Sequence, residues 1–504
     1  MQSAASASPT PSTSSTPPAS DSDFSATLSS IKREEKVTAW LVFCVFASTI
    51  GSSFQFGFHI GCINAPQKHI REWIAASHNT RSATVSLFAV GGMLGGLLSG
   101  YFADGSGRRR TILALNFVVC LATAAMVSAK FVNLYPLLMF GRFLIGIDVG
   151  IVVGVVPMYI TELSPKKFRG ALGSVHQLMI TVAILISQII GMPSLLGNEN
   201  LWPYIFTIPV VPMILQLMTL PFCPESPKFN IIQRYKDESA ERDLRKLRGE
   251  DDVLEEVEEL LKEADLSTSR TKSTKISKMF RGFLRWPTVV VIVLMAVQQL
   301  SGINAVIFYS TRIFGESLSE MAVYATIGIG IINVLQTSVS LYLIEKFGRR
   351  PLLIIGFIGM AISSIGLCVS LLTSENNTVW LPYLALAFIL IFVVAFATGP
   401  GSIPFFYASE IFANNERASA SSIVSFTNWL FAFIVGISFL SLKNLMGSYV
   451  FIIFTYVSVI AAVLTFAYLP ETKNMSLKEI EFDMEDRKPC FVKKKTLYQA
   501  ERLQ

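Results

Sequence analysis

Amide side chains recur inside the apolar segments of this chain, where polar residues are otherwise few. They occur in four segments from both halves of the sequence: Gln177 and Gln188; Gln298, Gln299 and Asn304; Asn333 and Gln336; and Asn428. An amide both donates and accepts hydrogen bonds, so it suits the hydroxyl groups of a neutral solute without holding that solute too tightly. Trp429 follows Asn428, and its flat ring could stack on the C–H face of a sugar. One interhelical hydrogen bond would explain a single amide, but four amide-bearing segments favour a shared cavity.

Some of these amides need a break in their helix to reach one cavity. On an unbroken helix Gln298 and Asn304 would point about 120° apart, and unwinding at Gly302 would bring them together. A second break is expected at residues 399–404, Gly-Pro-Gly-Ser-Ile-Pro, because two prolines remove backbone donors there. A break at membrane depth is typical of a cavity or a hinge, and here we expect a hinge.

Charged residues form a three-part signature that occurs twice. The first copy is Gly107-Arg108-Arg109, then Glu162 with Arg169 seven residues on, then Pro224-Glu225-Ser226. The second copy is Gly348-Arg349-Arg350, then Glu410 with Arg417 seven residues on, then Pro470-Glu471-Thr472. The copies lie roughly 245 residues apart, which indicates that the chain is two halves of one design.

Each part of the signature lies where an apolar segment meets polar sequence. Carboxylates and guanidiniums there can form bidentate pairs between helices, which would hold one side of the protein closed and part when it opens. The residues expected in this latch are Arg108, Arg109, Glu162, Arg169, Glu345, Arg349, Arg350, Glu410 and Arg417. Membrane-topology signals alone would explain the arginines but not the repeated Glu–Arg spacing.

Two titratable residues, His59 and Asp148, lie within apolar segments. An ionisable group there costs several kcal/mol unless it is paired. His59 could carry a proton through a transport cycle, or act as a neutral donor in the cavity, and we favour the second interpretation. Asp148 requires a basic or hydroxyl partner that the sequence does not identify.

Membrane-spanning helices are expected to position these residues. Only 15% of the 504 residues are charged, against about 25% in soluble proteins. Runs long enough to span a bilayer occur at roughly 38–62, 83–103, 111–129, 135–160, 172–192, 202–222, 287–311, 322–344, 351–373, 381–409, 419–440 and 447–469. The runs are continuously apolar, which excludes a β-barrel. The predicted fold class is an all-α membrane protein with twelve transmembrane helices in two six-helix halves and a cytoplasmic helical insert.

Basic residues predict the topology. Short loops after even-numbered segments hold ten Lys and Arg residues, and the opposite loops hold six. The positive-inside rule therefore places the even-numbered loops, the central polar stretch and both termini in the cytoplasm. Because the net charge of +6 comes from these boundary residues, no nucleic-acid partner is expected. The sequon at Asn376 falls outside in this topology and is a predicted glycosylation site, whereas the sequon at Asn474 falls inside.

The expected organisation is a disordered cytoplasmic tail (1–35), a six-helix half (36–222), a cytoplasmic helical linker (223–286), a second half (287–470) and a cytoplasmic tail (471–504). Apolar residues recur at helical spacing among glutamates over residues 253–261 of the linker. This amphipathic helix either lies against the bundle or is solvated. Glycines four residues apart over 92–100 and 146–154 predict close helix packing. The six cysteines show no disulfide or metal spacing, and no cofactor is expected.

Several short strings, taken in order, resemble one known family. They are Phe-Gln-Phe-Gly at 54–57, Ile-Asn-Ala-Pro-Gln at 63–67, Asp-x-x-Gly-Arg-Arg at 104–109, Pro-Glu-Ser-Pro-Lys at 224–228, Gln-Gln-Leu-Ser-Gly-Ile-Asn-Ala at 298–305 and Pro-Glu-Thr-Lys at 470–473. Over nearly all of residues 36–485 the chain resembles the sugar porters of the major facilitator superfamily. The resemblance is closest to the animal facilitative glucose transporters.

This resemblance implies a passive hexose uniporter of the plasma membrane that works by alternating access, with D-glucose as its substrate. It implies hexose binding by Gln177, Gln298, Gln299, Asn304, Asn333 and Asn428. It also implies a cavity wall at Trp429 and an extracellular gate at Tyr309. The chain departs from the family's pattern at Ala397 and Phe405, where glucose members carry glutamate and tryptophan. His59 stands where proton-coupled relatives carry an aspartate.

Three functions are compatible with these residues. The first is a facilitative hexose carrier. The second is a proton–sugar symporter using His59 or Asp148, against which the absent aspartate counts. The third is a sugar sensor, which usually needs a longer signalling tail. An enzyme is the least favoured, because the sequence offers no nucleophile–base pair, metal cluster or phosphate-binding loop. The sequence does not predict the oligomeric state.

Overall fold

The structure is a computed structural model that describes residues 36–63, 69–70, 73, 83–234, 237–250, 252–268, 275–307, 322–373 and 380–487. By its contacts the chain divides into residues 1–36 and 37–504, and every element below belongs to the second part. Tyr309 and Asn376, the predicted gate and glycosylation site, lie outside the described residues.

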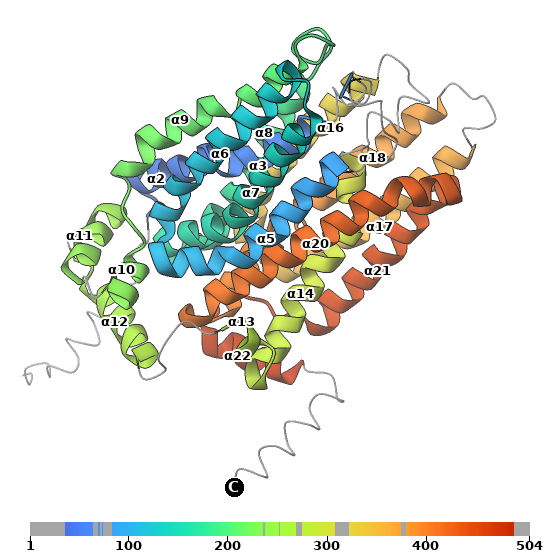
Figure 1. Ribbon diagram of the computed structural model, residues 1–504. Helices are drawn as coiled ribbons and strands as arrows, with labels where there is room; N and C mark the ends of the chain where they lie inside the picture. The colour runs from blue at the N-terminus through green and yellow to red at the C-terminus, as the bar shows by residue number, and fades with distance from the viewer. Residues whose placement is uncertain are drawn as a thin grey trace, which may run out of the picture. The chain divides into compact units, whose positions relative to one another are not determined.

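Long apolar helices make up most of the described residues (Figure 1). The first half consists of α2 (Ala39–Ile50), α3 (Ser53–Gly61), α5 (Ala83–Ser106), α6 (Arg108–Phe131), α7 (Tyr135–Leu163), η2 (Lys166–Phe168), α8 (Arg169–Ile190), η3 (Trp202–Thr207), α9 (Val210–Thr219) and η4 (Leu220–Phe222). The second half consists of α14 (Arg285–Leu300), α16 (Ala322–Phe347), α17 (Arg349–Thr373), α18 (Leu381–Thr398), α19 (Ile403–Ile411), α20 (Asn414–Met446), η8 (Gly447–Tyr449) and α21 (Val450–Tyr468). Shorter helices lie between and after the halves: α10 (Pro227–Arg234), α11 (Asp237–Arg248), α12 (Leu254–Thr268), α13 (Ile276–Met279), η5 (Gly282–Leu284) and α22 (Leu477–Asp486).

Within the described residues, eleven stretches are long and apolar enough to cross a bilayer. The last of them, Glu416–Tyr468, is 53 residues long and covers α21 and all but the first two residues of α20. Twelve membrane-length segments therefore follow one another in this part of the chain. This agrees with the number predicted from the apolar runs.

Each half has its own apolar core. One cluster of buried side chains is drawn from the second half and its flanking helices, and two others come mainly from the first half. The halves meet where α5 packs against α20 and α8 packs against α16. Figure 1 shows α5 and α20 running side by side.

The predicted glycine positions are places where helix backbones touch. A Cβ on Gly150 of α7 would lie 2.3 Å from the Gly92 oxygen of α5. Gly95, which lies outside the predicted pattern, is equally close-packed, since a Cβ there would lie 2.2 Å from the Ile147 carbonyl oxygen of α7. Another face of α5 meets the second half, where the amide of Gly100 donates to Ser422 Oγ at 2.9 Å. Small residues therefore let α5 pack on both halves at once.

The first signature copy forms a sharp turn and a helix cap. Gly107 has φ of 95°, which side chains rarely adopt, and it turns the chain from α5 into α6. Glu225 Oε1 accepts hydrogen bonds from the backbone nitrogens of Arg108 and Arg109, both at 2.9 Å. The carboxylate therefore satisfies donors that the first turn of α6 leaves free and complements the helix dipole.

The second copy repeats this arrangement. Gly348 has φ of 90° between α16 and α17. Glu471 accepts from the backbone nitrogens of Arg349 at 2.9 Å and Arg350 at 3.0 Å. The end of the bundle at which these two turns lie is called the signature end below.

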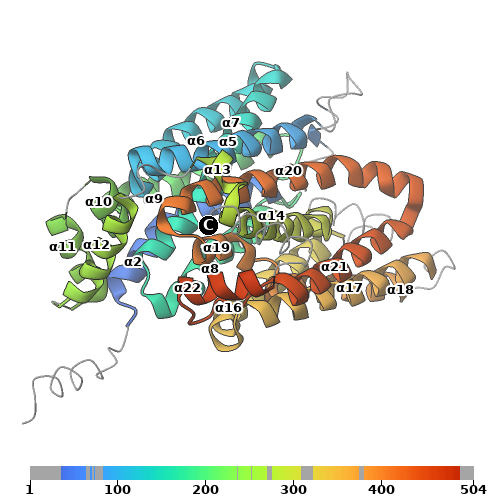
Figure 2. The ribbon, with the colours of Figure 1, turned by 90° about the horizontal axis from the view of Figure 1, so that it is seen from below.

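The central polar stretch packs on the first half at the signature end. Three of its helices, α10, α11 and α12, share an apolar cluster that includes Leu244 and Val257, and Figure 2 shows them gathered together. Arg248 Nη1 donates to the Leu163 carbonyl oxygen at 2.8 Å, and Lys166 pairs with Glu259 at 2.5 Å. The apolar face of the amphipathic helix α12 packs on α10 and α11, and an exposed ion pair joins the helix to the bundle, so the helix is neither fully solvated nor packed directly under the bundle.

Two glycines of α5 provide a test of this packing. Gly95→Ala should lower the thermal stability of the purified protein, because overpacking at a rigid backbone contact costs about 1–3 kcal/mol. Gly105→Ala is the matched control, since a Cβ there meets nothing within 4 Å and alanine favours a helix. Equal melting temperatures for the two variants would contradict the close packing of α5 on α7.

Candidate functional site

The membrane helix that carries the most amides is broken as predicted. Regular helix α14 ends at Leu300, Gly302 has φ of 97°, and helical backbone resumes at Ile303. The break lets Gln298 and Asn304 face the same cavity. A Cβ on Gly302 would also lie 2.5 Å from the Phe454 ring, so glycine is needed here for both conformation and space.

A central cavity of about 50 Å³ lies between the two halves. Its lining includes all seven residues expected to bind substrate: Gln177, Gln298, Gln299, Asn304, Asn333, Asn428 and Trp429. The remaining wall is apolar: Phe56, Ile60, Ile180, Ile184, Ile303, Ile307, Phe396, Phe405 and Ala432. Mostly apolar walls with a few convergent polar groups are typical of small-molecule sites.

Several of the amides form a hydrogen-bonded chain. Asn304 Nδ2 donates to Gln299 Oε1 at 2.5 Å, and Gln299 Nε2 donates to Asn428 Oδ1. Gln298 Nε2 donates to the carbonyl oxygens of Pro400 at 2.6 Å and Gly401 at 3.2 Å. Gln298 thus pairs backbone acceptors that the break between α18 and α19 would otherwise leave unpaired inside a membrane.

Other polar groups at the cavity have no protein partner among the described residues. Gln177 makes no side-chain hydrogen bond there, and neither Asn333 Oδ1 nor Trp429 Nε1 is paired. Asn333 and Trp429 are nevertheless 4% and 3% exposed. The indole packs against Phe56 and Phe88 at ring-centroid distances of 5.4 and 5.0 Å. Because a buried, unpaired polar group is costly, these groups are suited to bind a polar ligand.

Two amides named in the sequence do not line this cavity. Gln336 Nε2 donates to Thr398 Oγ1 at 3.0 Å, and so holds α16 to α18. Gln188, near the end of α8, lies against Gly330 of α16. For Gln336, an interhelical hydrogen bond is therefore sufficient explanation.

A buried arginine was missed by the sequence analysis. Arg142 of α7 is 2% exposed, donates through Nη1 to the His59 carbonyl oxygen at 3.1 Å and lies 4.2 Å from the centre of the Phe88 ring. Among the described residues no carboxylate lies within salt-bridge distance of it, and Asp148 Oδ2 is likewise unpaired. A lone arginine within the apolar run 135–160 was the available signal, since such residues are rare in membrane segments.

His176 was also missed. Its Nδ1 lies 2.7 Å from Ser53 Oγ, which joins α8 to α3. Its ring contacts Phe56 and Phe405, and both of these line the cavity. His176 directly precedes Gln177, so its place beside the amide stripe could have been suspected from the sequence.

The predicted latch residues form two bidentate ion pairs. Arg108 pairs with Glu162 through Nε–Oε2 at 3.0 Å and Nη2–Oε1 at 3.1 Å. Arg349 pairs with Glu410 at 2.7 and 3.3 Å. Each pair lies within its own half, so these pairs brace helices of one half rather than join the two halves.

The other latch residues have different roles. Three arginines donate to backbone carbonyl oxygens: Arg109 to Pro221 and Cys223, Arg350 to Phe466, and Arg417 to Phe412. Arg169 begins α8. Such bonds pair carbonyl oxygens at or just beyond the C-terminal ends of helices, where the helix leaves them without a partner.

Glu345 forms a hydrogen bond between the two halves of the protein. Its Oε1 accepts a hydrogen bond from the backbone nitrogen of Ala171 at 2.8 Å, in the first turn of α8. Two hydroxyls of α20 add to it, as Ser421 donates to the Gly154 oxygen at 2.7 Å and Ser422 binds the Gly100 amide at 2.9 Å. The signature end is therefore closed between the halves.

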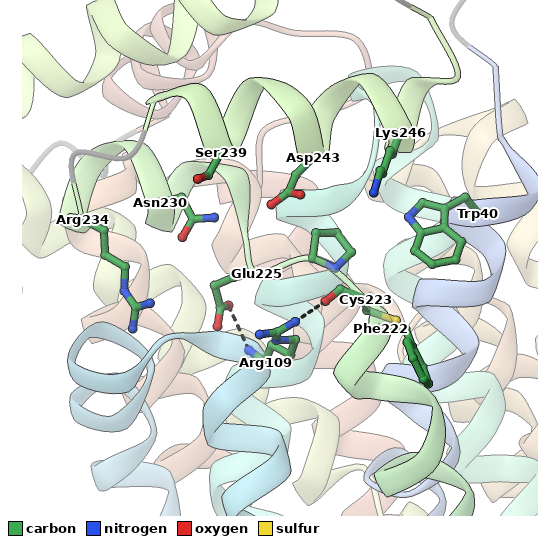
Figure 3. A pocket seen from close by; sticks show the side chains of 11 residues that line it. Trp40, Arg109, Phe222, Cys223, Glu225, Asn230, Arg234, Ser239, Asp243 and Lys246 are labelled. Atoms are coloured by element: carbon green, nitrogen blue, oxygen red, sulfur yellow. Dashed lines mark hydrogen bonds between the residues drawn. The ribbon is translucent and has the colours of Figure 1, made fainter.

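A second cavity, of about 270 Å³, lies at the signature end of the first half. Figure 3 shows it between α11 and the start of α6, with the Arg109 guanidinium reaching the Cys223 carbonyl oxygen. Its lining mixes cations and carboxylates, including Lys246 and Asp243. Burial raises the pKa of the Asp243 carboxyl, although Lys246 and neighbouring arginines oppose this. This cavity shares no lining residue with the central one.

Comparisons with known proteins agree with this architecture. Residues 43–483 match the family described as Sugar (and other) transporter. The chain is 45% identical to "Facilitated glucose transporter protein 1" of Caenorhabditis elegans, over 90% of this chain and 92% of that one. It is 40% identical to "Solute carrier family 2, facilitated glucose transporter member 3" of Ovis aries, over 88% and 92%.

Solved structures share the fold. The proton:xylose symporter XylE bound to 6-bromo-6-deoxy-D-glucose is 26% identical, with a TM-score of 0.78 over 89% of this chain and 99% of that one. The inward-open XylE of E. coli is 27% identical, with a TM-score of 0.69 over 88% and 99%. With its duplicated signature, twelve membrane-length segments and central amide-lined cavity, this chain belongs to the sugar transporter family of the major facilitator superfamily.

Proposed function

We propose that this chain is a facilitative carrier of hexoses, with D-glucose as its main substrate, in the plasma membrane. The observation that carries the proposal is the convergence of amides from four membrane segments, together with Trp429, on one cavity between the halves. The relatives that are 40–45% identical over most of the chain are named facilitated glucose transporters. No cofactor is needed for this function.

The arrangement of the amides suits reversible sugar binding. The hydroxyl groups of a hexose would exchange hydrogen bonds with Gln299, Asn304 and Asn428, which otherwise bind one another. They would also pair the free groups of Gln177, Asn333 and Trp429. Because the bonds formed replace bonds lost, the net affinity stays modest, as a carrier that must release its substrate requires.

The signature end is proposed to face the cytoplasm, with both termini on that side. The excess of Lys and Arg in the loops at this end supports the orientation. Alternating access then requires the contacts of Glu345, Ser421 and Ser422 between the halves to break when the cavity opens inward. The TM-score is lower with the inward-open structure than with the sugar-bound one, so the present structure is less similar to the inward-open conformation.

Proton coupling is the second candidate. In this chain the buried Arg142 binds the backbone of His59 and has no carboxylate partner among the described residues. Proton coupling would need a carboxylate beside the arginine to bind and release the proton, and none is present among the described residues. This counts against symport. The relatives named facilitated transporters are also more similar in sequence than the one named a proton symporter.

Transport without coupling can be measured directly. The purified protein in proteoliposomes should equilibrate labelled D-glucose to equal concentrations inside and outside, with or without a protonophore. Accumulation above the outside concentration that a protonophore abolishes would instead establish symport. Competition by galactose, mannose and fructose would rank the substrates.

Asn333→Ala should weaken glucose binding about three- to tenfold, because a hydrogen bond contributes about 0.5–1.5 kcal/mol. The melting temperature should hardly change, since Asn333 Oδ1 has no protein partner among the described residues. Gln336→Ala is the matched control on the same helix and should leave the affinity unchanged. The measurement is glucose binding by calorimetry, and equal affinities for the two variants would contradict the proposed site.

Glu345→Gln should shift the protein toward the inward-open state, because it removes the charge that binds the first turn of α8 across the halves. Spin labels at Gly105 and Phe347, on a background without reactive native cysteines, would report the separation at the signature end. We expect the longer distance to gain population. Glu259→Gln removes an ion pair with Lys166 that does not join the halves and should leave the distribution as it was; the same shift in both variants would refute the role of Glu345.

A further inference from the structure

A groove on the second half has no part in the sugar cavity. It measures about 290 Å³ and runs between α14 and α21, two membrane-spanning helices. Its lining is almost wholly apolar and includes Val290, Val293, Val297 and Leu464. A groove of this kind between lipid-facing helices has the shape and polarity to hold an acyl chain.

An aromatic pair marks one end of the groove. Trp286, in the first turn of α14, lies edge-on to Tyr468 at a centroid distance of 5.6 Å, and both line the groove. Trp286 Nε1 is buried and makes no hydrogen bond to a described residue. Tryptophan and tyrosine are enriched at the level where acyl chains meet headgroups, so this pair places its end of the groove at the headgroup level.

Basic residues precede the aromatic pair. Four cations fall within residues 275–286, namely Lys275, Lys278, Arg281 and Arg285, and no Asp or Glu occurs between 275 and 307. All four are exposed, and none has an ion-pair partner among the described residues. Four or more basic residues next to a membrane helix are typical of sites for anionic lipids.

The basic segment is held beside the groove. Thr288 Oγ1, in the first turn of α14, donates to the Met279 carbonyl oxygen at 3.0 Å. Met279 is fully buried in the core of the second half. Phe280 and Phe283, between the cations, are both 45% exposed, as expected for side chains that enter the headgroup region.

From these observations we propose that the groove binds an anionic glycerophospholipid of the leaflet at the signature end. One acyl chain lies between α14 and α21. The phosphate and the acidic headgroup lie on Lys278, Arg281 and Arg285. Each basic side chain near an anionic membrane surface contributes about a fivefold preference for the charged lipid, so three together select it over a zwitterionic lipid of the same chain length. The site requires only that the protein spans the membrane, and sugar transport need not be measured to test it.

Tryptophan fluorescence provides the test, with the full chain in phosphatidylcholine bilayers that contain a small, fixed fraction of phosphatidylserine. Bromine atoms are placed on the acyl chains of either the serine or the choline lipid, at equal mole fraction, and quench nearby indoles. The signal of Trp286 is the difference between the protein and its Trp286→Phe variant. We expect brominated phosphatidylserine to quench this signal at least severalfold more than brominated phosphatidylcholine.

Two sets of variants locate the lipid. The first removes the proposed headgroup contacts and should abolish the preference; it is the triple variant Lys278→Gln, Arg281→Gln, Arg285→Gln. Its control removes three exposed cations elsewhere in the cytoplasmic sequence and should retain the preference; it is Arg242→Gln, Lys246→Gln, Lys478→Gln. Val293→Phe, or Leu464→Phe if the first does not fold, should fill the groove and reduce quenching by both lipids.

Three results would overturn the proposal. Equal quenching by the two lipids would make the groove an ordinary bilayer contact. A preference that survives the triple variant would place the headgroup elsewhere. Displacement of brominated phosphatidylserine by an excess of soluble glycerophosphoserine would show that the headgroup binds without an acyl chain in the groove.

Discussion

Inside a bilayer no backbone polar group can be left without a partner, and much of this structure follows from that constraint. The chain breaks its helices at membrane depth, and amide side chains pair the exposed carbonyl oxygens. Gln216 donates to the Ala47 and Ser48 oxygens before the break between α2 and α3. Gln298 does the same for Pro400 and Gly401. Gln298, which holds the second of these breaks, also lines the central cavity and directly precedes Gln299 there.

The same requirement governs the helix starts at the signature end. Glu225 and Glu471 each bind the free amides of a first helical turn that follows a glycine with positive φ. Both helices are thereby fixed at a boundary where water could compete for those donors. The arginines of the same turns are then available to bind Glu162 and Glu410. Each half becomes a braced unit, which is what a rigid-body movement of two halves needs.

Duplication made the two halves alike locally but not where they touch. Glu345 and Asp104 occupy equivalent places, three residues before the glycine of each signature. Both lie near the arginine four residues on, Asp104 at 3.8 Å from Arg108 and Glu345 at 3.9 Å from Arg349. Glu345 also accepts a hydrogen bond at the start of α8, across the halves. The cavity is similarly uneven, since most of the amides that line it come from the second half, whereas both halves contribute to its apolar wall. The repeated residues stabilise each half, and the unrepeated ones distinguish one face of the interface from the other.

From the sequence alone it was possible to infer the twelve segments, the duplication and the set of amides, because each depends on local features such as apolar runs, spacing and glycine or proline breaks. Continuous hydrophobicity determines that a segment spans the bilayer whatever its neighbours are. Which partner a buried polar side chain takes is a different matter, because that depends on the rotation of one helix against another. Only the tertiary structure therefore decided that Arg108 and Arg349 bind within their own halves, that Glu345 crosses between them, and that Gln336 faces α18 while Asn333 faces the cavity.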